Sequence, residues 1–407
     1  MPSEHIDTLV IGGGQAGLVM SYRLKQRGIP HLVLERARIA ERWRSERWDG
    51  LKFQFPNWSV RLPDFDFPHA APDAFSNTGD IIKFIDAFAA FVAPPIRCGV
   101  EVTHLKRRDG CGGFLAETAD GAIEANNVVV ATGPYQRGLV PDLLRDDPVF
   151  QVHASGYQNP RQLPDGAVLV AGAGASGAQI AEELHRAGRR VFLSVGRHSR
   201  LPRRYRGRDL IWWLSELRLD QTPTEQRDPS RPLPVISGAY GGHTIDFRRF
   251  ATEGMTLLGR LATAQAGVLD IAPGLAENLA GGDDIYAGFL TMADAQVRLR
   301  GLDLPDDPAA WQPLPDPPDV TEPWRRLDLG AENIRAVVWA TGYGVDFGWI
   351  DIPVKDASGE PRHRAGITGV PGLYFLGLQW LAKMNSSFLS GVGDDATVLA
   401  DHIVARR

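Results

Sequence analysis

Two stretches of the chain share one order of apolar, glycine-rich and amphipathic positions. Residues 7–35 run from an apolar segment (7–11) through a glycine turn (12–17) and an amphipathic segment to a second apolar segment. Residues 167–195 repeat this order. Short apolar runs that end at glycine are typical of buried parallel strands, and the amphipathic segments between them indicate helices. The pattern therefore predicts two units of the same kind, each a strand, a turn, a helix and a second strand.

Each unit carries the glycine spacing of a dinucleotide-binding turn. In the first unit, Gly12 permits the tight turn, Gly14 lets the backbone approach a pyrophosphate, and Gly17 lets the helix pack close to the strand. The pyrophosphate then lies on free N–H groups at the start of the helix. The second unit has glycines at the same spacing: Gly172, Gly174 and Gly177.

The two units differ where their second strands end. Glu35 ends the first unit, and a carboxylate there accepts hydrogen bonds from the ribose hydroxyls of an adenosine. The second unit has Val195 at that position, followed by Arg197 and Arg200. Guanidinium groups can pair with a 2′-phosphate, which a carboxylate would repel. We therefore assign FAD to the first unit and NADPH to the second, an arrangement that implies electron transfer between them.

The order of elements predicts an α/β fold with two Rossmann-like dinucleotide-binding domains, the NADPH domain being inserted into the FAD domain. Two apolar strands end in Ala-Thr-Gly, at residues 131–133 and 340–342, and mark turns where the chain crosses between domains. The expected boundaries are 1–155 with 325–407 for the FAD domain, and 156–324 for the NADPH domain with a helical and loop insertion at 205–320. Further helices are expected at 80–92, 209–219 and 275–300, and a hairpin at 255–261 with 268–272.

A tryptophan-rich connector, residues 38–63, has neither a helical nor a strand period. We expect it to form a loop around the inner end of a bound dinucleotide, because long irregular connections inside a compact fold are usually functional. The amides of Gln54 and Asn57 are the candidate catalytic groups, each able to donate a hydrogen bond beside the flavin. Pro56 and Asn57 are equally the signal of a structural turn.

The residues expected to bind the cofactors come from these motifs. For FAD they are Gly12, Gly14, Gln15, Ala16, Gly17, Glu35, Arg36, Trp43, Arg44, Leu51, Ala131, Thr132 and Gly133. For NADPH they are Gly172, Gly174, Ala175, Ser176, Gly177, Ser194, Arg197 and Arg200, and the second Ala-Thr-Gly adds Ala340, Thr341 and Gly342.

Composition narrows the function further. The 407 residues carry a net charge of -5, so the charge balance does not indicate binding to nucleic acid or to an anionic membrane. The two cysteines, Cys98 and Cys111, are too far apart to form the CxxC pair of a disulfide reductase. The ten histidines lack metal-ligand spacing, so we expect no metal. With neither a signal peptide nor a membrane-spanning apolar run, the expected location is the cytoplasm.

These motifs together resemble the class B flavoprotein monooxygenases, which include flavin-containing monooxygenases, YUCCA-type enzymes and Baeyer-Villiger monooxygenases. The second half of that family's fingerprint, FxGxxxHxxx(F/Y), is present at His153 and Tyr157, whereas Asp147 and Val149 replace its first half. The Baeyer-Villiger version ends in Trp-Pro, which Tyr157 and Gln158 do not match. The resemblance also implies that the turn ending at Asp394 lies by the flavin.

The resemblance implies oxygenation of a small soft nucleophile with NADPH and O2 through a C4a-(hydro)peroxyflavin, N- or S-oxygenation being favoured over ester formation. The partners expected are a small-molecule substrate and O2, with a homodimer as a possibility. Two alternatives stay open: an NADPH-dependent flavin oxidase or reductase that releases H2O2, and a redox-sensing accessory protein that binds FAD without catalysis.

Overall fold

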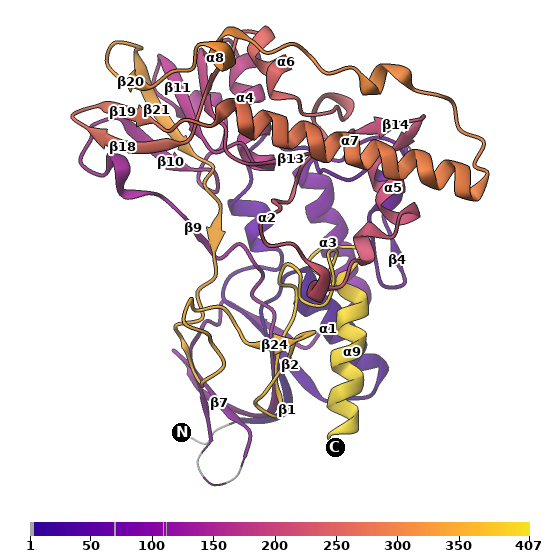
Figure 1. The fold of residues 1–407 in the computed structure, drawn as a ribbon. Coiled ribbons are helices and arrows are strands. Elements are labelled where there is room, and N and C mark those ends of the chain that lie inside the picture. The colour runs from indigo at the N-terminus through magenta and orange to yellow at the C-terminus, as the bar shows by residue number, and fades with distance from the viewer. Residues whose placement is uncertain (1–3, 69–70, 109, 111) are drawn as a thin grey trace.

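The structure is a computed structural model that describes residues 4–68, 71–108, 110 and 112–407. Two α/β domains lie end to end, joined near β9 (Arg137–Gly138), and both chain termini lie at the far end of the first domain (Figure 1). We call the domain built on the sheet of β1 (Glu4–Ile11) the first domain. The second domain is built on the sheet of β11 (Ala167–Ala171).

The first domain is built on a ten-stranded sheet whose main path runs β23-β6-β7-β8-β1-β2-β5. Strand β26 branches from β8 and leads to β25 and β24. Besides β1, its strands are β2 (His31–Glu35), β5 (Ile96–Cys98), β6 (Val102–Arg107), β7 (Phe114–Thr118), β8 (Gly121–Val130), β23 (Ile350–Asp351), β24 (His363–Arg364), β25 (Ile367–Thr368) and β26 (Leu373–Phe375). The parallel pairs β1 with β2 and β1 with β8 form its centre, and their apolar residues are almost fully buried.

Three helices pack on this sheet: α1 (Gln15–Gln26), α3 (Thr78–Val92) and α9 (Val392–Ala405). Helix α3 is the helix expected at 80–92, and its first turn is capped by Asn77, whose side-chain oxygen accepts a hydrogen bond from the Asp80 N–H. Helix α1 contacts both α3 and α9. Figure 1 shows α9, in yellow, running along the first domain to the C-terminus.

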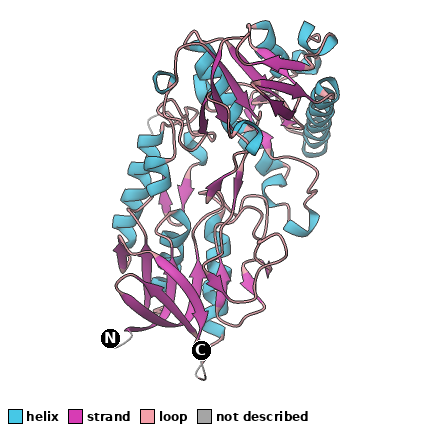
Figure 2. Cartoon of the chain, turned by 90° about the vertical axis from the view of Figure 1, so that its left-hand side faces the viewer, coloured by secondary structure: helices cyan, strands magenta, loops and turns pink. Residues whose placement is uncertain are grey.

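The second domain is built on a five-stranded sheet in the order β10-β21-β11-β12-β17, in which every neighbouring pair is parallel. Its strands besides β11 are β10 (Phe150–His153), β12 (Val191–Ser194), β17 (Thr256–Leu258) and β21 (Ile334–Trp339). A three-stranded antiparallel sheet lies beside it: β18 (Leu261–Gln265), β19 (Val268–Ile271) and β20 (Arg326–Asp328). Figure 2 shows the sheets of the two domains at opposite ends of the molecule.

The helices of the second domain include the two expected from periodicity at 209–219 and 275–300. They are α4 (Ala175–Arg186), α5 (Leu210–Glu216), α6 (Phe247–Thr252), α7 (Leu275–Arg300) and α8 (Pro318–Thr321). Helix α7 crosses one side of the domain (Figure 1) and is fixed by the half-buried Asp283, which pairs with Arg200 and Arg248. The short pairs β13 (Ser199–Arg200) with β16 (Pro234–Val235) and β14 (Arg204–Tyr205) with β15 (Arg208–Asp209) complete the insertion.

The domain boundaries expected at 155 and 325 are wrong. Strand β21 pairs with both β10 and β11, so residues 150–153 and 334–339 belong to the second sheet. The reason is that each Ala-Thr-Gly strand closes its own glycine unit. Ala131 donates its N–H to Ile11 at 2.8 Å in the first domain, and Ala340 donates to Ala171 at 2.8 Å in the second. The chain therefore crosses just after each Ala-Thr-Gly, where β9 pairs with β22 (Tyr343–Gly344).

The connector is more regular than its sequence predicts. It contains the short helix α2 (Glu41–Ser45) and the strand β3 (Arg61–Leu62), which pairs with β4 (Phe65–Asp66) just beyond the connector. Trp48 and Leu51 leave the first domain and are buried in the hydrophobic core of the second. The connector thus joins the two domains through side-chain packing.

Candidate dinucleotide sites

The two glycine turns have the same geometry. Gly12 has φ +115° and Gly172 has φ +104°, a region that favours glycine. A Cβ on Gly12 would lie 2.5 Å from the carbonyl oxygen of Ala131, and a Cβ on Gly172 would lie 2.5 Å from that of Ala340. These two glycines are therefore required by the fold itself.

The third glycine of each turn is also required by packing, whereas the middle one is not. A Cβ on Gly17 would overlap the carbonyl oxygen of Gly12, and a Cβ on Gly177 would overlap that of Gly172. A Cβ on Gly14 or Gly174 would have no heavy atom of the described residues within 4 Å. The open space at the middle glycine, at the start of α1 or α4, fits a pyrophosphate that lies against the backbone. The residues present therefore fit a dinucleotide at each turn.

Glu35 lies where the ribose of the first dinucleotide is expected. Its carboxylate accepts hydrogen bonds from the N–H groups of Gly13 at 2.6 Å and Ala37 at 2.9 Å. The carboxylate thus rests against the glycine turn, at the tip of β2. The side chain of Arg36 is exposed and lies 3.9 Å from Glu101.

The connector residues predicted to touch FAD are held mainly by protein groups. Arg44 forms an ion pair with Asp86 of α3 at 2.6 Å and donates to the carbonyl of Ile39 at 3.0 Å. Leu51 is buried in the second hydrophobic core, and Trp43 packs against the cores of both domains. These contacts give Arg44 and Leu51 a structural role in bracing the connector.

The two candidate catalytic amides differ in their surroundings. The side chain of Asn57 is 7% exposed, donates to the carbonyl of Ala71 at 3.0 Å and accepts from the Ser76 hydroxyl at 2.7 Å. It holds the connector against residues 71–77, as the turn interpretation predicts. Gln54 is half-buried, and its side-chain amide has no hydrogen-bond partner within the described ranges. Of the two, Gln54 is the amide whose donors are available.

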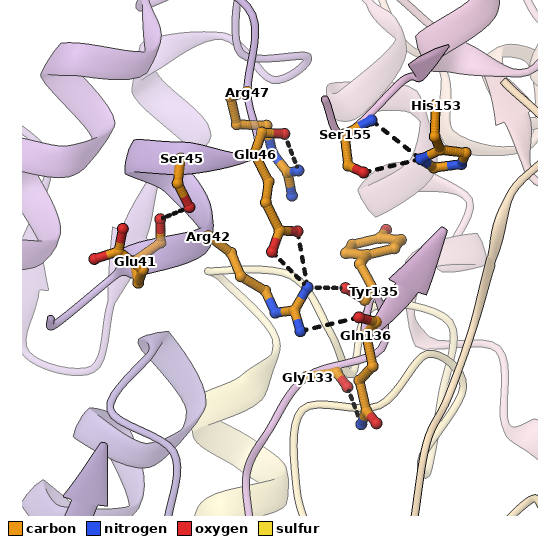
Figure 3. Close-up of polar contacts among 10 residues, drawn as sticks. All are labelled: Glu41, Arg42, Ser45, Glu46, Arg47, Gly133, Tyr135, Gln136, His153 and Ser155. Atoms are coloured by element: carbon orange, nitrogen blue, oxygen red, sulfur yellow. Dashed lines mark hydrogen bonds and ion pairs between the residues drawn. The ribbon is translucent and has the colours of Figure 1, made fainter. Parts of the chain in front are cut away.

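Helix α2 holds the first crossing segment at the junction of the domains (Figure 3). Arg42 pairs with Glu46 at 2.8 Å and donates to the backbone carbonyls of Tyr135 and Gln136. The amide of Gln136 donates in turn to the carbonyl of Gly133 at 2.8 Å and to the hydroxyl of Thr132 at 3.0 Å. The first Ala-Thr-Gly segment is thereby fixed from the connector side.

Of the two fingerprint residues, His153 takes part in this junction and Tyr157 binds helix α4. His153 is hydrogen-bonded through Nε2 to the Gly342 carbonyl at 3.0 Å and through Nδ1 to the Ser155 hydroxyl at 2.9 Å, the latter contact being drawn in Figure 3. Burial lowers the pKa of His153. Tyr157 is fully buried and donates its hydroxyl to Glu183 at 2.8 Å. His153 thus supports the second crossing segment at Gly342, and Tyr157 fixes α4 through Glu183.

The second glycine turn opens into a cavity of about 310 Å³. It is lined by Gly172, Gly174 and Ser194 of the dinucleotide unit, and by Arg197 and Arg260 from the loops after β12 and β17. Neither arginine has a carboxylate partner among the described residues, and both are exposed. A phosphate in this cavity would meet two unpaired guanidinium groups.

Arg200 does not take the predicted place beside Arg197. Its guanidinium is 11% exposed and pairs with Asp246 and Asp283, each at 2.6 Å. It also lies over the ring of Tyr286, 4.3 Å from the centroid. With its charge already neutralised inside the domain, Arg200 stabilises the α7 contact, and Arg260 provides the second cation of the cavity.

The segment before α9 closes over the start of α1, beside the first glycine turn. The amide of Gln15 donates to the Ser387 carbonyl at 2.8 Å, and a Cβ on Gly377 would lie 2.6 Å from the Cβ of Ala16. Asp394 forms an ion pair with Lys383 at 2.5 Å. The segment that leads into α9 thus contacts the start of α1, and the place of the Asp394 turn beside the flavin stays a prediction.

Comparisons with known proteins identify the family. The model for pyridine nucleotide-disulphide oxidoreductases matches residues 9–218, which span the first glycine turn and the whole of the second dinucleotide unit. The chain belongs to this family. An uncharacterized CzcO-like oxidoreductase of Geobacillus kaustophilus is 33% identical over 98% of this chain and 99% of its own length.

The family match and the similar proteins together confirm the α/β fold with two dinucleotide-binding domains and the resemblance to flavoprotein monooxygenases. A probable indole-3-pyruvate monooxygenase of Arabidopsis thaliana, YUCCA3, is 28% identical over 44% of each chain. The flavin-containing monooxygenase of Stenotrophomonas maltophilia has the same fold, with a TM-score of 0.67 at 17% identity over 99% of both chains. So does the OTEMO complex with FAD and NADP, with a TM-score of 0.58 at 14% identity over 99% of this chain and 85% of that one.

This family is one of oxidoreductases, and FAD and NADPH, the two cofactors predicted from the glycine turns, are confirmed at the level of the family. Disulphide chemistry in such a fold requires a redox-active cysteine pair. Cys98 is exposed, and Cys111 lies outside the described residues. Within the described ranges, no group of three or more His, Cys, Asp or Glu side chains is placed to hold a metal ion. No helix in those ranges has both the length and the apolar character needed to cross a bilayer.

Sequence reasoning missed three residues to which the structure gives special surroundings, and one of them, Arg260, lines the cavity at the second glycine turn. Arg260 follows a strand with no motif of its own. Asp395 is 3% exposed in the first turn of α9, and burial raises its pKa to about 6. Arg203 is 2% exposed and reaches the connector. Only the arginine-rich composition of 197–208 signalled a special role for that region.

Proposed function

We propose that this oxidoreductase is an NADPH-dependent flavoprotein monooxygenase that transfers oxygen to a small soft nucleophile, an amine or a sulfide. The observation that carries the proposal is the pair of matching glycine turns on one chain, each with an open middle glycine. The charged groups near the two turns differ: a carboxylate lies at the first turn and two unpaired arginines lie at the second. Two different dinucleotides fit this difference.

The residues of the first domain would hold FAD. The turn at Gly12 and Gly14 and the start of α1 would take the pyrophosphate, and Glu35 would take the ribose hydroxyls. FAD, when bound, supplies electron transfer from NADPH and the activation of O2. The segment before α9, which contacts Gln15, and the connector would enclose the inner end of this site and limit the access of water to the reacting oxygen.

The residues of the second domain would hold NADPH. Its pyrophosphate would lie at Gly174 on the first turn of α4, and its 2′-phosphate between Arg197 and Arg260 in the cavity. Two charge-assisted contacts to the 2′-phosphate favour NADPH over NADH by about 1.5–3 kcal/mol each. The amide of Gln54, which has no hydrogen-bond partner among the described residues, would donate a hydrogen bond to the oxygen that is transferred.

The incomplete fingerprint favours an amine or a sulfide as substrate. Tyr157 is buried against Glu183. Together with Gln158 it stands where the Baeyer-Villiger fingerprint has Trp-Pro. The test is the stoichiometry of product and NADPH with sets of amines, sulfides and ketones. An oxygenated amine or sulfide formed in proportion to NADPH supports the proposal, and a lactone or ester as the main product contradicts its second half.

An NADPH oxidase that releases H2O2 is the second candidate. The observation that favours it is that Asn57 is hydrogen-bonded to Ala71 and Ser76. Of the two candidate amides, only that of Gln54 then remains to keep the reactive oxygen from being lost as H2O2. The same measurement distinguishes the two: an oxidase forms peroxide equal to the NADPH consumed, with every organic substrate tried.

A further inference from the structure

One buried arginine of the second domain binds the connector at Gln54. Arg203 precedes β14 and is 2% exposed. Its Nη1 donates to the backbone carbonyl of Gln54 at 2.7 Å. Its guanidinium also lies over the ring of Phe75, 4.5 Å from the centroid. A side chain of the second domain thus contacts the connector at Gln54 and the neighbouring segment of the first domain at Phe75.

The guanidinium is held in one orientation by its own domain. Nε donates to Asp209 at 2.9 Å, and Nη2 donates to both carboxylate oxygens of Asp209 at 2.8 Å. Asp209 is itself fixed because it caps α5, accepting from the Ile211 N–H at 2.9 Å. The backbone N–H of Arg203 donates to the Thr244 hydroxyl at 2.9 Å. Nη1 is the remaining nitrogen of the guanidinium, and its hydrogen bond goes to the connector.

Two glycines of the second domain complete the contact. A Cβ on Gly238 would overlap the carbonyl oxygen of Phe53, and a Cβ on Gly242 would lie 2.5 Å from the ring of Phe75. On its other side the connector is fixed within the first domain, since the Phe53 N–H donates to the Ser76 carbonyl at 2.7 Å. The peptide of Gln54 is therefore clamped between domains while its side-chain amide stays without a partner among the described residues.

Stability alone does not explain this arrangement. Burying an arginine lowers its pKa and costs desolvation, and a buried ion pair is often no more stabilising than apolar residues of similar size. Arg206 is a matched comparison in the same domain: it pairs with Asp294 at 2.6 Å and Asp306 at 2.7 Å. Those contacts stay within the second domain, whereas Arg203 alone of the two reaches the connector.

We propose that Arg203 is a positioning residue, through which the second domain sets the place of Gln54 beside the first cofactor. A shift of about 1 Å in such a group can cost up to about a hundredfold in rate. The proposal rests on the proposed function only for the placement of the Gln54 amide next to the flavin. It requires Arg203 to act through Gln54 and not separately from it.

The test compares Gln54→Ala, Arg203→Met, their combination, and Arg206→Met as the control that removes an ion pair of the same domain away from the connector. Two readouts are taken on the FAD-loaded protein: the visible absorption and circular dichroism of the bound flavin, and the share of NADPH electrons that appear as H2O2. We expect Q54A and R203M to change the flavin spectra in the same direction and to raise the peroxide share at least about threefold. The double variant should change neither readout further, and R206M should leave both as in the wild type.

Unchanged spectra in folded R203M, or effects of Q54A and R203M that add, overturn the inference. If R203M does not fold, Arg203→Lys replaces it, because a lysine keeps the charge and loses the fork; wild-type spectra in R203K then overturn the inference, and a partial shift that Q54A abolishes supports it. Failure of the proposed function has a different signature: the wild type itself forms only peroxide, while the spectral comparison still decides the role of Arg203.

Discussion

The structure separates glycines that the fold requires from glycines that a ligand requires, and Gly174→Ala is the sharpest test of that division. Gly174 is the N-cap of α4 at φ -72°, ψ -175°, a conformation that alanine adopts. Within the part of the chain that the structure describes, no heavy atom lies within 4 Å of an added Cβ. The lower capping preference of alanine and its smaller entropy loss on folding roughly cancel, so the free energy of unfolding should change by less than about 0.5 kcal/mol.

The effect on the cofactor should be much larger. A methyl group at Gly174 would occupy the space in which a pyrophosphate meets the backbone N–H groups. Losing one charge-assisted hydrogen bond costs about 1.5–3 kcal/mol, which corresponds to an increase of about 10- to 150-fold in the Kd of NADP+. The measurement is isothermal titration of the FAD-loaded variant with NADP+, alongside urea unfolding of the same sample.

Two matched variants complete the experiment. Gly14→Ala should lose FAD and keep its affinity for NADP+, because the same space opens at the other turn. Gly177→Ala should lower the free energy of unfolding by about 1–3 kcal/mol even without a ligand, since its Cβ would overlap the Gly172 carbonyl. The reasoning is refuted if G174A binds NADP+ as tightly as the wild type, or if G174A is destabilised as strongly as G177A.

Three further predictions concern cofactor choice, pH and oxygen protection. Arg197→Ala and Arg260→Ala should each raise KM for NADPH about tenfold and leave KM for NADH unchanged in steady-state kinetics. Equal effects on KM for both cofactors would show that the cavity does not bind the 2′-phosphate. Burial raises the pKa of Asp395 from an ordinary 3.8 to about 6, so the native state binds the proton more tightly than the unfolded state, and stability falls as pH rises from about 4 to 6. The free energy of unfolding of Asp395→Asn should therefore exceed that of the wild type by up to about 3 kcal/mol at pH 7.5 and equal it at pH 4. An equal gain at both pH values would show that the titration of Asp395 is not its cause. Gln54→Ala should raise H2O2 release while melting as the wild type does, and Asn57→Ala should lower the melting temperature because it removes the contacts to Ala71 and Ser76; the opposite pattern would exchange their roles.

Local signals carried most of the correct fold prediction. The glycine turns, Glu35 at the tip of β2 and the helix at 275–300 all depend on residues close together in the chain, and the structure has each of them. The domain boundaries failed because the two Ala-Thr-Gly strands look alike, and only pairing across the chain shows that β21 belongs with β11.

The same limit applies to the candidate site. Arg200 and Arg197 lie in one arginine-rich run, and nothing local distinguishes the one that pairs with Asp283, far along the chain. Arg260 and Arg203 contribute through their positions after folding, and no motif surrounds either residue. The residue type of Asn57 makes it a candidate hydrogen-bond donor. Its partners Ala71 and Ser76 come from a segment that only the fold brings against the connector.

The central claim is that one dinucleotide fold holds FAD and its duplicate delivers electrons from NADPH, and anaerobic reduction tests it most directly. The purified protein is loaded with FAD, and the absorbance of the oxidised flavin is followed after mixing with NADPH or with NADH. The account predicts one FAD per chain, rapid bleaching by NADPH and much slower bleaching by NADH at the same concentration. A protein that takes up no flavin, or one that NADH reduces faster than NADPH, would contradict it.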